Sequence, residues 1–425
     1  MPEGTRREFL GLVGGAALEL VAGGRLRAGE APADPLRLGA PVTHSDWMLR
    51  EGVAWGPEGV RHMLDTCRAG GWSRVYWRVL DGGRALYASK LLDPQGKWDG
   101  DNFWHPRREA DRQLAERYTG MSAQARAALL SRLERHDYAG FDTLAEAVRY
   151  GHQVGLQVHA WISINEDDHG WGLQSRFSRA HPQFRWRKRD GTPYRSQLSF
   201  AYPQVMAYKL AIVEEIGRGY AVDGLFLDWL RTGDVRDNPQ TDAQGVADHG
   251  YEEPLVSGFR ARYGTDPRQL PNGDPRWVRW RAQPHTEFMR EVRQRAPGLP
   301  VAVLVAHPWC YRGQQDPIDG NLRGLLLDVR AWGRERLVEA AVAAGYYRQG
   351  GSAAAACRAL RAELGRTAEV WHYAWVPETV AQVQQECALA RELGARQVLF
   401  WEADYIDGRQ NREELQRAMR EQAGR

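Results

Sequence analysis

The stretch AVDGLFLDWLR, residues 221–231, contains a short apolar run that ends in an aspartate. Gly224 to Leu227 have the pattern of a buried strand, and Asp228 follows directly, ahead of Trp229 and Arg231. Burying a carboxylate without a partner is costly, so a chain does not place one at the end of a core strand without compensation. The stretch therefore predicts a strand that opens into a polar site, with Arg231 as a candidate partner of Asp228.

Seven further short apolar runs have the same β-type pattern. The eight predicted strands are 36–43, 74–79, 156–162, 223–228, 300–306, 339–346, 369–375 and 397–401. Segments of helical period separate or follow them, at 59–68, 143–153, 203–218, 277–295, 329–337, 353–364, 377–393 and 411–422. Eight strand–helix units predict an α/β protein whose parallel strands close into a (β/α)8 TIM barrel. An open doubly wound sheet is the alternative, but no GxGxxG follows the first strand.

The connecting loops differ in length at the two ends of the predicted barrel. Helix-to-strand connections are short and contain glycine, as in GRGYAV before the fourth strand. Strand-to-helix connections are long at 80–142, at 163–202 and from Arg231 onward. The long insertions therefore lie at the C-terminal ends of the strands, where barrels bind ligands and perform chemistry. No linker is visible, and residues 34–425 are predicted to form one domain.

The N-terminal segment indicates export. TRREFLG at residues 5–11 matches the twin-arginine pattern, and the weakly apolar GLVGGAALELVAGG follows it. Residues 1–33 are predicted to be a signal peptide that directs the protein to the periplasm or outside the cell. An ordinary N-terminal helix is the alternative. No other run approaches 18 apolar residues, so no membrane span is predicted.

Composition narrows the class of partner. A net charge of +3 gives no electrostatic reason to expect nucleic acid. The four cysteines have no CxxC spacing, so neither a zinc site nor any cofactor is predicted. The chain has 17 tryptophans, which either fill a core or stack on the apolar faces of sugar rings.

Three carboxylates at predicted strand ends are candidates for catalysis: Asp228, Glu402 and Glu166. Hydrolysis of a glycosidic bond uses an ionised carboxylate and a partner carboxylic acid that holds a proton. Glu402, in FWEADY, fits the acid because an aromatic surround raises a carboxyl pKa. Glu166, in NEDDHG, is the rival because its two neighbouring aspartates would do the same by repulsion. Each residue also has a structural alternative to catalysis. Asp228 could form an ion pair with Arg231, Glu402 could cap or pair within the barrel rim, and Glu166 could be a charge on the surface of a loop.

Candidate substrate-binding residues are aromatic, charged, imidazole or amide groups at the same predicted strand ends. They are His44, Asp46, Trp77, Arg78, His159, Trp161, Asn165, Trp229, Arg231, His307, Tyr346, Trp371, His372, Trp375, Trp401 and Asp404. Nearly every strand supplies a tryptophan or tyrosine together with a hydrogen-bonding group. The alternative is that the tryptophans are core residues and the histidines only make internal hydrogen bonds.

Several motifs, in their order and spacing, resemble the glycosyl hydrolase-like family 10 of bacterial barrels. They are VHAWISIN at 158–165, HPQF at 181–184, SFAYPQVMAYKLAIVEEI at 199–216, VDGLFLDWLR at 222–231 and LDVRAWGRERLVEAAVAAGYY at 327–347. The resemblance covers roughly residues 36–405 and implies a (β/α)8 fold, a carbohydrate substrate and Asp228 as the catalytic carboxylate. The chain departs from the family at Trp229, where a second acid is common, and at Thr232-Gly233, where Tyr-Pro is common.

Three functions are compatible with these residues. The first is an exported glycoside hydrolase that acts on a poly- or oligosaccharide with paired carboxylates. The second is a carbohydrate-binding barrel that has lost catalysis, which the departure at Trp229 favours. The third is a metal-dependent hydrolase built on His44, Asp46, His159, His307 and Asp404, but the first strand lacks the HxH pair that such sites use, so no metal is predicted.

Overall fold

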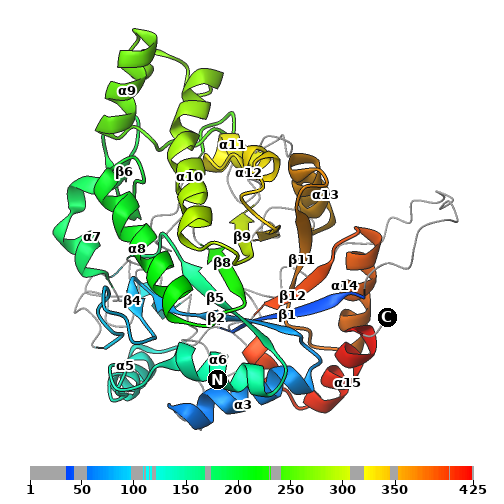
Figure 1. Cartoon of the computed structure of the whole chain (residues 1–425). Coiled ribbons are helices and arrows are strands. Elements are labelled where there is room, and N and C mark those ends of the chain that lie inside the picture. The colour runs from blue at the N-terminus through cyan, green and yellow to red at the C-terminus, as the bar shows by residue number, and fades with distance from the viewer. Residues whose placement is uncertain are drawn as a thin grey trace, which may run out of the picture.

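A computed structural model of the chain describes residues 35–42, 55–96, 109, 112–113, 115–116, 121–167, 174–228, 230, 241–306, 320–344, 353–401 and 403–423. Eight strands in these residues form a closed barrel in which every neighbouring pair runs parallel. They are β1 (Arg37–Val42), β2 (Arg74–Arg78), β5 (Gln157–Ser163), β8 (Gly224–Asp228), β9 (Val301–Ala306), β10 (Ala340–Ala344), β11 (Glu369–Trp375) and β12 (Gln397–Trp401). The order β1-β12-β11-β10-β9-β8-β5-β2 places the first and last strands side by side (Figure 1). The predicted (β/α)8 barrel is confirmed.

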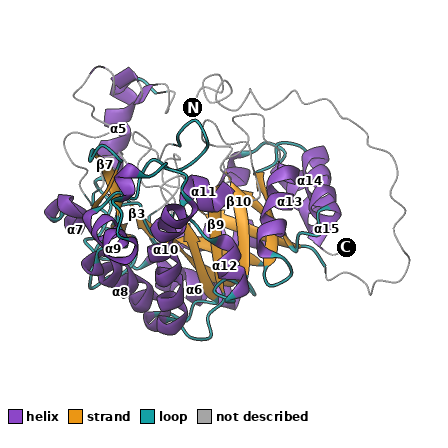
Figure 2. Ribbon diagram, turned by 90° about the horizontal axis from the view of Figure 1, so that it is seen from above, coloured by secondary structure: helices purple, strands orange, loops and turns teal. Residues whose placement is uncertain are grey.

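Helices cover the outside of the barrel, as the view from above shows (Figure 2). Those predicted from the sequence are α3 (Pro57–Ala69), α6 (Thr143–Gln153), α8 (Pro203–Gly219), α10 (Pro275–Arg295), α12 (Val329–Arg334), α13 (Ala353–Leu364), α14 (Val380–Glu392) and α15 (Arg412–Ala423). Local chemistry explains where several begin. The Asp142 side chain accepts from the amide of Ala145 at the start of α6, and Thr379 and Gln382 form a capping box at the start of α14.

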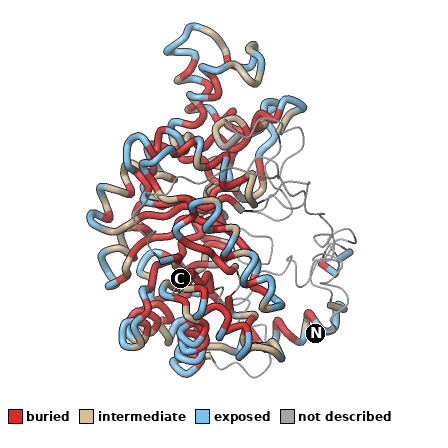
Figure 3. The backbone as a smooth tube through the Cα atoms, turned by 90° about the vertical axis from the view of Figure 1, so that its right-hand side faces the viewer, coloured by how far each residue is buried: buried red, intermediate tan, exposed pale blue. Residues whose placement is uncertain are grey.

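The strands are apolar on both faces, because one face meets the helices and the other fills the barrel interior. Figure 3 shows buried residues concentrated in the central strands and exposed residues on the outer helices. On β2, the Tyr76 ring lies inside the barrel, 5.3 Å from His159 and 4.9 Å from Phe226 between ring centroids. Successive side chains of a strand point to opposite faces. Tyr76 and Arg78 therefore face inward, and Trp77 faces outward.

Insertions follow several strands. The described ones contain β3 (Leu80–Asp81), β4 (Arg84–Ala85), α5 (Ala123–Leu133), α7 (Arg176–Ala180), η2 (Pro182–Phe184), β6 (Arg185–Arg187), β7 (Pro193–Leu198), α9 (Glu253–Tyr263), η3 (Pro267–Gln269), α11 (Gly320–Leu325) and η6 (Ala403–Gly408). Helix α9 lies at the tip of a projection at the top of Figure 1.

Helix α9 was not predicted, because the sequence after strand β8 appeared only as a polar stretch. Its apolar residues Leu255, Val256 and Phe259 are buried in a small cluster with Tyr251 and Trp277, apart from the barrel core. Trp277 belongs to α10, so the helix is stabilised by a contact with a neighbouring helix rather than by its own pattern. None of the helices in the described part of the chain is long and apolar enough to cross a membrane. The signal peptide at 1–33 and the single domain at 34–425 stay predictions.

Candidate active site

Asp228 is the last residue of β8, a strand in which all five residues are buried. Its side chain is 2% exposed at the C-terminal end of the barrel. The indole Nε1 of Trp161 on β5 donates a hydrogen bond to Oδ2 of Asp228 at 3.1 Å. Strands β5 and β8 are neighbours, and Ser163 stands opposite Asp228 in the register. The carboxylate is therefore held in place by an aromatic donor from the adjacent strand.

A series of aromatic rings extends from the indole that binds this carboxylate. The Trp161 ring lies 4.8 Å from Trp401 of β12 and 6.0 Å from Phe226 of β8, measured between centroids. Tyr373 of β11 extends the group, 5.3 Å from Trp401 and 6.0 Å from Trp375. Trp401 is half-buried and Trp375 is 40% exposed. The rings therefore run from the buried floor near Asp228 to the solvent at the end of β11.

A buried ion pair lies beside Trp161. Arg78, at the end of β2, pairs with the carboxylate of Glu166, and the two side chains are 9% and 0% exposed. The Arg78 guanidinium stands 5.3 Å from the centroid of the Trp161 ring and donates through Nε to the carbonyl of Leu80 at 3.1 Å. Because Arg78 stands opposite Trp161 in the β2–β5 register and Glu166 follows β5, the pairing of these two strands brings the three residues together.

Asn165 lies in the turn after β5, directly before Glu166 in the sequence. The backbone amide of Ile164 donates to the carbonyl of Asp228 at 2.9 Å, which fixes this turn against β8. Asn165 is fully buried, and neither of its amide atoms has a hydrogen-bond partner among the described residues. A buried amide without partners is costly. Asn165 is therefore available to hydrogen-bond an incoming polar group.

A second buried ion pair joins the turn after β5 to helix α8. Asp167 pairs with Lys209 of α8, and both side chains are at most 3% exposed. Burial lowers the pKa of Lys209, against the opposing effect of Asp167. The carbonyl of Asp167 also accepts from the amide of Ser175 at 2.8 Å, so Asp167 is tied to the start of α7.

The structure places four of the predicted substrate-binding residues away from Asp228. Trp77 faces the helices, where its Nε1 donates to Oγ1 of Thr143 on α6 at 3.2 Å. His372 also faces outward, and its Nε2 lies 2.6 Å from Oε2 of Glu386 on α14. These two residues do not line the mouth of the barrel, because they occupy outward positions of β2 and β11.

His159 and Trp371 point into the barrel but lie at a lower level. Each contacts the ring of Tyr76, with centroids 5.3 Å and 5.7 Å away, and Trp371 donates to Glu369 at the start of β11 at 2.8 Å. Burial lowers the pKa of the His159 imidazole to about 4. Both residues are packing groups of the interior below the mouth.

Several predicted residues lie outside the described residues. These are the candidate acid Glu402 and the substrate-binding candidates His44, Asp46, Trp229, Arg231, His307 and Tyr346, together with the side chain of Asp404. Within the described residues, Asp228 is brought together with Trp161, Arg78, Asn165, Glu166 and Trp401. No group of three or more His, Cys, Asp and Glu side chains in this part of the chain could hold a metal ion.

Sequence reasoning missed one contributor to the site, Lys209. Tyr373, which belongs to the predicted strand 369–375, shares the inward face of β11 with Trp371 and Trp375. Lys209 was missed because nothing in the apolar pattern of α8 identifies a cation that pairs with Asp167 on another element.

The fold and the site define a class of protein, a barrel of the kind found in glycoside hydrolases. The chain is similar to the PgaB (BpsB) glycoside hydrolase domain from Bordetella bronchiseptica, with 13% identity, a TM-score of 0.55, and coverage of 91% of this chain and 99% of that one. It is also similar to the catalytic domain of a β-amylase from Paenibacillus polymyxa, with 9% identity, a TM-score of 0.54, and coverage of 88% and 94%. At such identities the likeness shows the fold alone.

The family is shown by the sequence. Residues 118–372, more than half of the chain, match the family described as Glycosyl hydrolase-like 10, and the chain belongs to it. The resemblance drawn from the motifs is thereby confirmed. No curated protein matches the chain in sequence.

Proposed function

We propose that the protein is an exported glycoside hydrolase that cleaves a poly- or oligosaccharide, with Asp228 as its catalytic carboxylate. The observation that carries this proposal is the position of Asp228. It is a buried carboxylate at the C-terminal end of a barrel strand, bound by Trp161 and flanked by aromatic rings. Export rests on the twin-arginine pattern at residues 5–11.

The proposed role of Asp228 starts from the contact that holds its carboxyl group. The Trp161 indole binds Oδ2 and fixes the orientation of the carboxyl group. An ionised carboxylate in this position stabilises or attacks the oxocarbenium-like carbon of a glycosidic bond. The exposed face of Trp375 and the half-buried ring of Trp401 supply surfaces on which sugar rings stack. Asn165, whose amide atoms have no partner among the described residues, supplies an amide for a hydroxyl.

The contacts of Glu166 favour Glu402 as the acid partner. A general acid has to hold a proton, whereas the ion pair with Arg78 stabilises the charged form of Glu166. Glu402 follows Trp401 directly in the chain, and the Trp401 ring contacts the indole that binds Asp228. We therefore assign Glu402 as the acid and Glu166 as a residue that holds Arg78 against Trp161.

The test is a panel of poly- and oligosaccharides incubated with wild-type protein and with Asp228→Asn, Glu402→Gln and Glu166→Gln. Asp228→Asn and Glu402→Gln are each expected to lower kcat by about 10²–10⁴-fold on any glycan that the wild type cleaves. Glu413→Gln is the matched control, because Glu413 is an exposed carboxylate on α15. Equal rates in all the variants would remove the assignment of both carboxylates.

A second candidate is a carbohydrate-binding barrel without catalysis. It is favoured by Trp229, which stands where the family commonly has a second acid, and by the neutralisation of Glu166 by Arg78. Such a protein would bind a glycan of the panel without cleaving it, and Asp228→Asn would leave the dissociation constant unchanged.

A further inference from the structure

A pocket of about 700 Å³ lies in the insertions that follow β5, β8 and β9, at the same end of the barrel as Asp228 but lined by other residues. Its volume falls within the range of small-molecule sites, about 300–1,000 Å³. Three basic and three acidic side chains contribute to its lining. They are Lys188, Arg189 and Arg323, and Asp190, Asp242 and Asp248.

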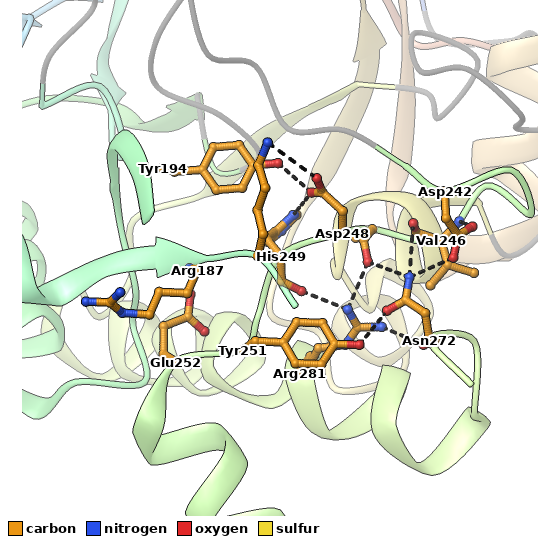
Figure 4. A network of polar contacts seen from close by, with 12 residues as sticks. Arg187, Tyr194, Asp242, Val246, Asp248, His249, Tyr251, Glu252, Asn272 and Arg281 are labelled. Atoms are coloured by element: carbon orange, nitrogen blue, oxygen red, sulfur yellow. Dashed lines mark hydrogen bonds and ion pairs between the residues drawn. The ribbon is translucent and has the colours of Figure 1, made fainter. Parts of the chain in front are cut away.

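The floor of the pocket is fixed by a buried arginine (Figure 4). Arg281 of α10 is 1% exposed and donates to the carbonyls of Ala247, His249 and Asn272 at 2.7–2.9 Å. The side chain of Asn272 in turn donates to Oδ2 of Asp242 at 2.7 Å and accepts from the hydroxyl of Tyr251 at 2.8 Å. The backbone beneath the pocket therefore has its position set before any ligand binds.

The walls come from two insertions that are joined to each other. Lys188 and His249 form an antiparallel bridge between the insertions after β5 and β8. Trp186 stacks on the buried ring of His249, with centroids 4.1 Å apart and planes 7° apart. The Tyr194 hydroxyl donates to Asp248, and the Lys188 ammonium stands 3.8 Å from the same carboxylate. Contacts between the two insertions therefore fix the walls of the pocket relative to each other.

The charges of the lining identify the class of ligand. Three cations and three carboxylates leave no net formal charge, so neither an anion nor a cation is strongly favoured. The cations of the lining donate hydrogen bonds and its carboxylates accept them. A sugar hydroxyl can pair with either group, because it both donates and accepts. Gln244, which also lines the pocket, adds an amide of the same dual character.

We propose that this pocket is a second carbohydrate-binding site, which takes a neutral, hydroxyl-rich oligosaccharide away from the catalytic carboxylate. The inference rests on the proposed function for its substrate class, and it adds a site at which a glycan chain is held outside the barrel mouth.

The test uses the Asp228→Asn protein, so that binding is measured without hydrolysis. The probes are cellohexaose, maltohexaose, xylohexaose and chitohexaose, titrated by calorimetry, with inorganic sulfate as the ionic comparison. Arg323→Met removes a donor whose described contact is a 3.4 Å bond to the carbonyl of Gln244. Gly273→Leu places a side chain in the pocket, where a Cβ would contact Val246 at 3.3 Å.

At least one hexasaccharide is expected to bind, and each pocket variant is expected to weaken that binding about tenfold, as the loss of a hydrogen bond from a charged donor or a steric block would. Arg262→Met on α9 is the matched control, because Arg262 is exposed and outside the lining. Amide hydrogen exchange should slow in residues 186–194 and 241–251 when the sugar is added.

The proposal that the pocket binds a carbohydrate would be contradicted if Arg323→Met, Gly273→Leu and Arg262→Met had equal dissociation constants and the sugar left amide hydrogen exchange unchanged. Binding of sulfate alone, or of no hexasaccharide, would contradict it as well. Failure of the proposed function is a different result, since it would appear as absence of glycan cleavage by the wild type while the pocket variants still weaken binding.

Discussion

Replacing Arg78 with methionine tests the central arrangement of the site. The guanidinium of Arg78 pairs with Glu166 and lies over the ring of Trp161, which holds Asp228. Methionine keeps an unbranched apolar chain as far as the position of Nε and removes the charged guanidinium. The carboxylate of Glu166, whose side chain is 0% exposed, then loses that cation.

The expected loss of stability follows from burial. Removing one partner of a buried ion pair costs about 3–5 kcal/mol in the free energy of unfolding, because the remaining charge stays out of water. Arg78→Met/Glu166→Gln removes both charges, so it should recover most of this loss and give a coupling energy of about 2 kcal/mol or more. For comparison, the exposed pair Arg112–Glu109 has side chains that are 51% and 67% exposed, and breaking it should cost less than about 1 kcal/mol.

Urea unfolding followed by tryptophan fluorescence measures these free energies, with equal m-values as the check that the variants unfold by the same transition. The double variant also separates the effect of charge from the effect of packing. The cost of an unpaired charge disappears in it, whereas any packing lost against Trp161 remains. The reasoning would be refuted if Arg78→Met lost no more stability than a variant in which the exposed Arg112–Glu109 pair is broken. The buried ion pair of Arg78 and Glu166 would then not stabilise the fold around Asp228.

Three further predictions concern the same part of the barrel. Trp161→Phe removes the indole donor to Asp228 and keeps a ring, so kcat on a cleaved glycan should fall about tenfold with a smaller change in KM. Burial lowers the pKa of His159 from 6.5 to about 4, so below pH 6.5 the unfolded chain binds a proton that the folded protein excludes, and the folded protein loses stability as pH falls. His159→Leu removes this effect. Its free energy of unfolding, measured in urea, should therefore fall by about 3 kcal/mol less than that of the wild type between pH 8 and pH 4. Lys209→Met should destabilise the protein by about 3 kcal/mol, measured in the same way, and adding Asp167→Asn should restore most of it.

Much of the barrel could be predicted from the sequence because its signals are local. Each strand is a short apolar run, and the caps at Asp142 and Thr379 sit at the starts of predicted helices. The position of Asp228 at a strand end also followed from the apolar residues before it. Helix α9 could not be predicted in this way, since Phe259 and its neighbours are buried only against Trp277 of α10.

The sequence alone therefore determined the order of strands and helices, the end of the barrel that carries the insertions, and the carboxylate at the end of β8. The tertiary structure decided which side chains face one another. Trp77 and Arg78 are adjacent in sequence, yet one contacts a helix and the other pairs with Glu166, 88 positions along the chain. The physical reason is that alternate residues of a strand point to opposite sides, and a run that is apolar on both faces does not reveal which side is the interior until the barrel closes.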